Sequence, residues 1–104
     1  MANMMKMMKQ AQAMQAKMQK VQADLAEREV EFSSGGGMVT ARATCDGVLK
    51  KVSIDPKVVD PDDVEMLEDL VFTAVAGALD LGRETMSEEM GAITKGMNIP
   101  GMGM

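Results

Sequence analysis

The sequence predicts an α+β domain of two layers, in which a three-stranded antiparallel sheet is flanked by two helices and the first helix is long. Three observations support this class. A helical pattern occupies the first 25 residues, short stretches with period-two alternation follow, and a second helical pattern begins after an acidic segment. Strands and helices segregated along the chain in this way are typical of α+β folds. We expect one domain, residues 1–90, because 104 residues can bury a single modest core.

Residues 2–25 are predicted to form a helix with an apolar seam. No glycine, proline or acidic residue lies between Met4 and Ala23, and the residues present favour helix. Apolar residues recur at alternating steps of three and four, the spacing of a coiled coil. One small sheet cannot cover both this seam and a second helix, so we expect the seam to pack against a second copy in a homodimer. The residues expected at this contact are Met7, Met14, Met18, Val21 and Leu25.

Three strands are predicted, over residues 27–33, 38–45 and 48–55. Glycines 35–37 are expected to form the first turn, and Asp46-Gly47 is a hairpin signal for the second. Alternate residues of each strand are expected on the inner face of the sheet. These residues are Val30, Phe32, Val39, Ala41, Ala43, Val48, Val52 and Ile54.

The second helix is predicted over residues 61–90, with Asp60 as its N-cap and Pro61 at its first position. An apolar stripe is expected to lie on the sheet, and Gly77 and Gly82 are expected to permit close packing. Residues 91–104 hold four glycines and one proline and are expected to form a flexible tail. The stripe consists of Val64, Leu67, Val71, Ala74, Val75 and Ala78.

The first helix is predicted to carry a basic surface on an otherwise acidic chain. Residues 1–23 hold four lysines and no acid, whereas residues 24–104 hold seven basic and sixteen acidic residues, a net charge of −9. At about 100° per residue the four lysines fall within roughly 80° of the helix surface, about 120° from the apolar seam. A segregated basic surface can bind nucleic acid although the chain is acidic as a whole. This lysine stripe consists of Lys6, Lys9, Lys17 and Lys20.

Two interpretations of the lysine stripe remain open from the residues alone. It fits the solvated face of a coiled-coil helix. It also fits a surface for an anionic partner, because no glutamate is interleaved to relieve repulsion among the lysines. That partner would be duplex DNA bound mainly through phosphates, since the chain has no Tyr or Trp to stack on single strands. As an alternative of another class, the Met-rich amphipathic helix would dock a partner protein.

Catalysis is poorly supported by the composition. The chain has no histidine, which removes the commonest general base and most metal schemes. Cys45 therefore has no histidine partner and is expected to be a structural thiol. The acidic residues 60–65 lack the spacing of a calcium loop and are expected to cap the second helix. We expect a protein that is not an enzyme and has no metal, cofactor or small-molecule substrate.

The sequence also predicts a cytoplasmic location. It has no run of 18 apolar residues and no apolar N-terminal segment with a cleavage site, so no membrane association is expected. The lone cysteine fits a reducing compartment.

Seven short segments form a series that spans nearly the whole chain. They are Met7–Gln12, Met14–Met18, Gly35–Val39, Ser53–Pro56, Met66–Val71, Ala74–Val75 and Ile99–Gly101. In this order they resemble the YbaB/EbfC family of nucleoid-associated DNA-binding proteins. The glycine-rich turn and the Leu-Glu-Asp-Leu segment are the most specific of them.

The resemblance implies a small bacterial cytoplasmic protein that forms a homodimer whose helices project like tweezers. It also implies binding to duplex DNA with low sequence preference, and association with the nucleoid. The phosphate contacts are assigned to the lysine stripe from the helical wheel, because the family offers no compact DNA signature to carry over. Arg42 and Lys51, on the outer face of the predicted sheet, are the second candidates.

Overall fold

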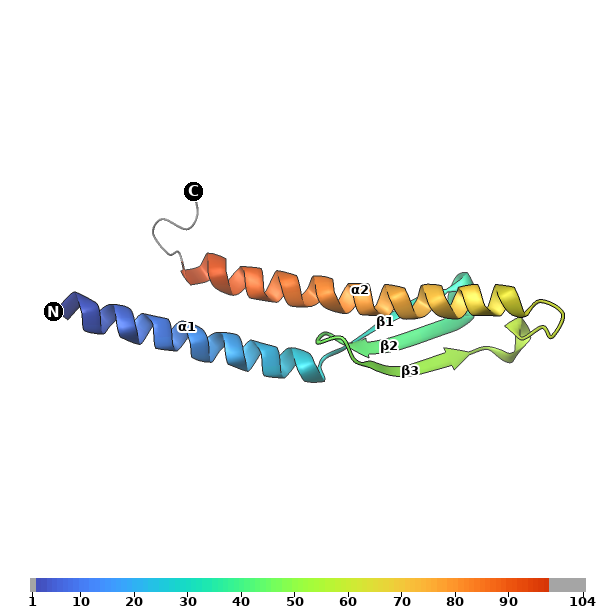
Figure 1. Ribbon diagram of the computed structural model, residues 1–104, viewed down its shortest axis with the longest axis horizontal. Coiled ribbons are helices and arrows are strands. Elements are labelled where there is room, and N and C mark those ends of the chain that lie inside the picture. Colours follow the sequence, from blue (N-terminus) through green and yellow to red (C-terminus); the bar gives the residue numbers. More distant parts are fainter. Residues whose placement is uncertain (1, 98–104) are drawn as a thin grey trace.

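The computed structural model describes residues 2–97 and confirms the α+β class, with a long first helix and a three-stranded antiparallel sheet (Figure 1). Its strands begin and end within two residues of their predicted positions. The elements in chain order are α1 (Ala2–Glu27), β1 (Glu29–Ser34), the 3-10 turn η1 (Gly35–Gly37), β2 (Val39–Thr44), β3 (Leu49–Ile54), the 3-10 turn η2 (Pro56–Val58) and α2 (Val64–Met97).

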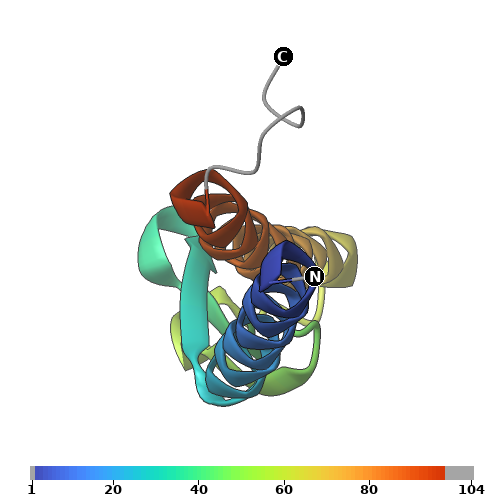
Figure 2. The same cartoon turned by 90° about the vertical axis from the view of Figure 1, so that its left-hand side faces the viewer.

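The molecule is elongated, with extents of 74 × 27 × 16 Å. The first half of α2 lies on the sheet, and its second half continues past the sheet beside α1, which runs away from the sheet (Figures 1 and 2). The radius of gyration is 20.1 Å, whereas a compact domain of this length has about 13 Å. Much of α1 therefore has no other part of the described chain around it.

The sheet has the order β1-β2-β3, so β2 is the central strand. Ala41 opposes Phe32 on one side and Val52 on the other. The register between β2 and β3 then shifts, because Arg42 pairs with Lys51 while the next residue of β2 pairs with Leu49. The residue skipped, Lys50, is the extra residue of a β-bulge. Because a bulge interrupts the alternation of faces, the sequence pattern could not assign Lys50 to a face of the sheet.

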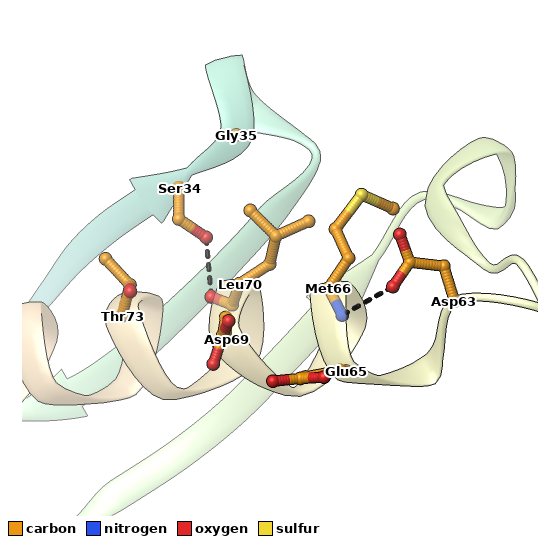
Figure 3. Close-up of a pocket in the computed structure, with 8 residues that line it drawn as sticks. All are labelled: Ser34, Gly35, Asp63, Glu65, Met66, Asp69, Leu70 and Thr73. Atoms are coloured by element: carbon orange, nitrogen blue, oxygen red, sulfur yellow. Dashed lines mark hydrogen bonds between the residues drawn. The ribbon is translucent and has the colours of Figure 1, made fainter.

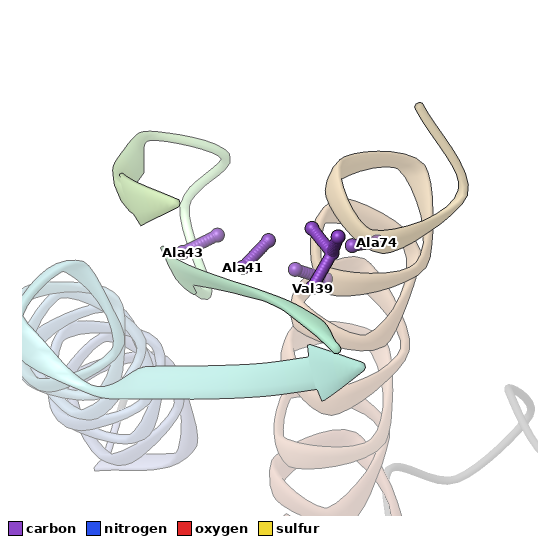
Figure 4. Close-up of a cluster of buried hydrophobic side chains, with 5 residues drawn as sticks. Val39, Ala41, Ala43 and Ala74 are labelled. Carbon is purple, nitrogen blue, oxygen red and sulfur yellow. The ribbon is translucent and has the colours of Figure 1, made fainter. Parts of the chain in front are cut away.

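The core lies between β2 and the first half of α2 (Figure 4). The prediction that alternate residues of the second strand face inward is confirmed, because all three are fully buried. Short alanine side chains on both elements let the helix approach the sheet closely. The buried cluster consists of Val39, Ala41, Ala43, Ala74 and Ala78.

The two glycines of α2 that the sequence associates with close packing both lie against the sheet. A Cβ at Gly77 would overlap the ring of Phe32. A Cβ at Gly82 would lie 2.9 Å from the backbone oxygen of Thr44 and 3.2 Å from the Cα of Cys45. The expectation of close packing at these positions is confirmed.

The predicted start of the second helix is wrong by three residues. Asp60 accepts a hydrogen bond from the backbone N–H of Asp62 at 2.9 Å and closes a separate turn. Asp63 is the residue that caps α2, since its Oδ1 accepts from the backbone N–H of Met66 at 3.2 Å. The segment holds three aspartates, and each of them is able to cap a helix. Pro61 lies in the turn before the helix.

The predicted end of the second helix is also wrong. α2 continues through Gly91 to Met97, so residues 91–97 are helical and not a tail. Gly91 has open space where a Cβ would be, and Ile93 is buried. A buried apolar residue extends the packed face of the helix and offsets the cost of a glycine, about 1 kcal/mol. Residues 98–104 of the predicted tail lie outside the described residues.

Four apolar residues predicted to lie between the sheet and the second helix are more exposed than expected. Phe32 of β1 is 40% exposed and Val64, the first residue of α2, is 53% exposed. Val48 precedes β3 and Ile54 ends it, and they are 47% and 41% exposed. For Val48 and Ile54 the cause is the position of α2, which packs against β1 and β2 and scarcely reaches β3.

Candidate nucleic-acid interface

All four members of the lysine stripe are exposed on α1. The helix is continuous from Ala2 to Glu27, so Lys6 and Lys20 are separated by about 21 Å along one rigid element. α1 runs away from the sheet, and the second half of α2 lies beside it (Figure 1). The predicted basic surface is therefore present as one accessible stripe.

Among residues 2–97 the lysine stripe also has no ion-pair partner. In the described part of the chain the ion pairs all involve arginines: Arg28 with Glu89 at 3.1 Å, Arg83 with Asp80 at 2.6 Å, and Arg42 with two glutamates. Exposed pairs of this kind contribute little stability, but they reduce the charge that each arginine offers to a ligand. The lysines of α1 remain available to an external anion.

The second candidates for DNA contact are Arg42 and Lys51. They are paired across β2 and β3 and therefore lie side by side on the outer face of the sheet. Arg42 is held by Glu29 at 3.4 Å and by Glu31 at 3.1 Å from the adjacent strand. Two carboxylates therefore balance the two cations of this patch. Sequence reasoning missed these pairs, although alternation placed both glutamates and Arg42 on the outer face.

The apolar seam of α1 changes in burial along its length. Met7 is 67% exposed, whereas Met14, Met18 and Val21 are half-buried and Leu25 is fully buried. The second half of α2 lies beside this part of α1. The assignment of Leu25 to a contact between subunits is therefore corrected, because its own chain already covers it.

Leu25 belongs to the joint where α1 meets the sheet. The backbone N–H of Cys45 donates to the backbone oxygens of both Leu25 and Arg28, at 3.2 and 3.1 Å. The Cys45 side chain is buried and free, in agreement with the expected structural thiol. Because Gly82 packs against the same backbone, three segments far apart in sequence fix the direction of α1 here.

The acidic stretch at the start of α2 borders a pocket of about 440 Å³ beside the glycine turn (Figure 3). Asp63, Glu65 and Asp69 line it, and Ser34 Oγ donates to the backbone oxygen of Leu70 across it at 2.6 Å. Asp63 caps the helix, as described above. A pocket with three carboxylates repels phosphate, so this end of the molecule is unsuited to nucleic acid.

Two further properties of residues 2–97 bear on the kind of site. They contain no group of three or more Cys, Asp or Glu side chains placed to hold a metal ion. None of the described helices combines the length and apolar character needed to cross a membrane.

Comparison with known proteins gives consistent matches over nearly the full chain. The sequence model of the YbaB/EbfC DNA-binding family matches residues 1–97. A nucleoid-associated protein of Alkaliphilus metalliredigens is 51% identical over 100 residues, which cover 96% of this chain and 88% of the relative. A nucleoid-associated protein of Afipia carboxidovorans is 47% identical over 104 residues, which cover 100% of this chain and 99% of the relative.

A solved structure has a similar fold. The crystal structure of an uncharacterized protein from Helicobacter pylori matches with a TM-score of 0.62 at 19% identity, covering 75% of this chain and 90% of that chain. At this identity the likeness supports the fold alone.

Proposed function

Because this chain belongs to the YbaB/EbfC DNA-binding family, we propose that it is a nucleoid-associated protein that binds duplex DNA as a homodimer. Contacts between α1 lysines and phosphates supply most of the affinity, and sequence preference is low. The protein acts in the cytoplasm, on the nucleoid, and catalyses no reaction.

The observation that carries this proposal is the contrast between the lysines of α1 and the arginines elsewhere. The four lysines are exposed and lack ion-pair partners within the described chain, whereas Arg28, Arg42 and Arg83 are each paired. Unrelieved like charges on a helix destabilise it slightly. A bound polyanion removes that repulsion and releases its own counter-ions, which favours association.

The dimensions of the stripe suit duplex DNA. Over the roughly 21 Å from Lys6 to Lys20, a duplex presents about twelve phosphate charges, at one per 1.7 Å of axis. Flexible lysine side chains can reach several of these phosphates without fixed register. Contacts to phosphate position a protein but carry no direct sequence information, which accounts for the low preference.

The acidic body restricts DNA to α1. Residues 24–104 carry a net charge of −9, and the outer face of the sheet is balanced by its own glutamates. DNA is therefore repelled from the sheet and from the start of α2. In a homodimer two lysine stripes, eight lysines in all, contribute to one complex.

The alternative function is docking of a partner protein on the methionines of α1. It is supported by the exposure of Met4, Met5, Met7 and Met8 at the free end of the helix. Flexible methionines suit varied protein surfaces. Such a contact would depend on apolar burial and would persist when salt screens the lysines.

Fluorescence anisotropy with labelled duplexes of unrelated sequence but equal length tests the proposed function. At one fixed salt concentration we expect Kd values that agree within a few-fold, because phosphates are common to all duplexes. A duplex bound about 10³-fold more tightly than the others would contradict low preference. Absence of binding to every duplex would contradict DNA binding itself and favour the alternative.

A further inference from the structure

α1 begins with a group of methionines that are open to solvent. Met4, Met5, Met7 and Met8 are between 58% and 67% exposed. Among the other methionines whose burial the structure describes, Met66 is 39% exposed and the rest are half-buried. The four exposed residues form the methionine tip, in the first two turns of a helix whose N-terminus points away from the sheet (Figure 1).

The methionine tip belongs to a stretch of helix that no other part of the described chain covers. Every side chain from Asn3 to Ala13 is exposed, and burial begins at Met14. The first turn has no acidic residue to favour the helix N-terminus, and Lys6 and Lys9 repel each other one turn apart. A helical segment of this length is marginal in water on its own. Small changes in helix propensity at the tip therefore change how much of it is helical.

We propose that the methionine tip is a site of reversible oxidation, at which hydrogen peroxide converts the thioethers to sulfoxides and loosens the turns that carry Lys6 and Lys9. A sulfur lone pair attacks one oxygen of the peroxide, the O–O bond breaks and an S–O bond forms. The proton on the transferred oxygen joins the departing hydroxide, so water leaves. Sulfur loses two electrons and the peroxide gains them. The effect on DNA rests on the proposed function, whereas the oxidation itself does not.

Exposure directs the peroxide to these thioethers and away from the thiol. Cys45 is 1% exposed, at the joint where α1 meets the sheet. Oxidation of a thiol requires access to its thiolate, and burial denies that access. Met14 and Met18 on the same helix are half-buried beside α2. The most accessible sulfur atoms of the described side chains are therefore those of the tip.

Two of the tip residues stay accessible even when the apolar seam of α1 is covered by a second copy. At about 100° per residue, Met8 lies roughly 90° and Met5 roughly 150° around the helix from the centre of the seam. Met5 is only about 40° from Lys9, at the border of the lysine stripe. The oxidation site is thus continuous with the surface assigned to DNA.

Oxidation changes the helix because it changes the chemistry of the side chain. Methionine is a good helix former. A sulfoxide is polar, and its oxygen is an acceptor that competes for backbone N–H groups, as serine and asparagine do in non-helical conformations. Several sulfoxides within two turns that lack tertiary support are expected to unwind them. Lys6 and Lys9 then keep their charge but lose their fixed place beside Lys17 and Lys20.

Peptide mapping of the full chain by mass spectrometry during treatment with hydrogen peroxide tests the site. We expect the tip to be oxidised at least about fivefold faster than the half-buried Met86 and Met90 of α2, with Cys45 still reduced. Equal rates at the tip and at Met86, or earlier oxidation of Cys45, would overturn the assignment.

Circular dichroism of the same samples tests the loosening. Residues 2–8 are seven of the helical residues, of which α1 has 26 and α2 has 34, so we expect a loss of up to about a tenth of the helical signal. Methionine sulfoxide reductases A and B with dithiothreitol should restore it, because two thiols supply the electrons, a disulfide forms and the sulfoxide oxygen leaves as water. An unchanged helical signal from a fully oxidised tip would contradict the loosening.

Anisotropy with one duplex at about 0.1 M salt tests the consequence for DNA. We expect Kd to rise about threefold to tenfold on oxidation, the equivalent of about one phosphate contact, because the loosened lysines must be ordered again on binding. The reductases should reverse this rise as well. An unchanged Kd would overturn the link between the tip and DNA.

Two variants with four leucines each show which methionines are responsible. Each variant is compared with itself before and after peroxide, and leucine resists oxidation while matching methionine in helix propensity and volume. The tip variant is expected to show a Kd ratio near one, and the control variant the same rise as the parent. The reverse order would overturn the proposal. The tip variant carries Met4→Leu, Met5→Leu, Met7→Leu and Met8→Leu, and the control carries Met38→Leu, Met66→Leu, Met86→Leu and Met90→Leu.

Failure of this inference is distinguishable from failure of the proposed function. An untreated parent that binds no duplex would contradict DNA binding, and the oxidation map and the helical signal would then decide the inference alone. A parent that binds duplex DNA but whose tip is not oxidised preferentially would overturn the inference and leave the proposed function standing.

Discussion

Replacing Lys17 and Lys20 by glutamine is expected to weaken binding to duplex DNA by about 10²–10³-fold at about 0.1 M salt. In a homodimer the double variant removes four of eight lysines. If about six of the eight contact phosphates, about three contacts are lost, each worth about eightfold at this salt. Glutamine and lysine have similar helix propensities, and the apolar seam is unchanged. Anisotropy titrations on several duplexes would measure the loss, which should be uniform across sequences.

The matched control for this variant changes the same number of charges on the sheet. Arg42→Gln with Lys51→Gln is expected to weaken binding by less than about tenfold, because Glu29 and Glu31 already neutralise Arg42. The opposite order of effects would move the DNA site from α1 to the outer face of the sheet.

Gly82→Ala is expected to destabilise the protein by about 1–3 kcal/mol, although alanine is the better helix former. The added Cβ would lie 2.9 Å from the backbone oxygen of Thr44 and 3.2 Å from the Cα of Cys45. Backbone atoms at the joint of α1 and the sheet cannot rotate away as a side chain can. Thermal unfolding would show a Tm lowered by roughly 5–20 °C.

Gly91→Ala is the matched control on the same helix. It has open space around the added Cβ and should raise stability by up to about 1 kcal/mol, the difference in helix propensity. Equal stability of Gly82→Ala and the parent would mean that α2 and the sheet are not tightly joined. No gain from Gly91→Ala would mean that residues 91–97 do not contribute a stable helix.

The sequence was most informative where one periodicity ran without interruption. The helical pattern of residues 2–25 predicted α1 to within two residues, because helix formers and a regular seam agree there. Alternation likewise predicted the buried face of β2, which is the central strand and is covered by α2. Both results depend on local pattern alone.

Several features that depend on how elements meet could not be predicted. The bulge at Lys50 arises from pairing between strands, and the exposure of Ile54 follows from where α2 crosses the sheet. Leu25 continues the apolar seam in sequence, but it lies at the joint and is buried by its own chain. A seam read from one helix does not reveal which neighbour covers each turn.

The candidate site shows the same division. The exposure of the lysine stripe followed from its distance around the helix from the seam. The neutralisation of Arg42 depended on the register that places Glu31 directly opposite it. An alternating pattern gives the face of each residue but not its cross-strand partner.

The assignment of DNA binding to the lysine stripe is tested most directly by the salt dependence of binding to one duplex. With about six phosphate contacts and a slope of about −0.9 per contact, raising monovalent salt from about 50 to 200 mM should weaken binding on the order of 10³-fold. The logarithm of affinity should fall linearly with the logarithm of salt. A change of less than about threefold over this range would contradict lysine–phosphate contact and favour a docking role for the methionine face.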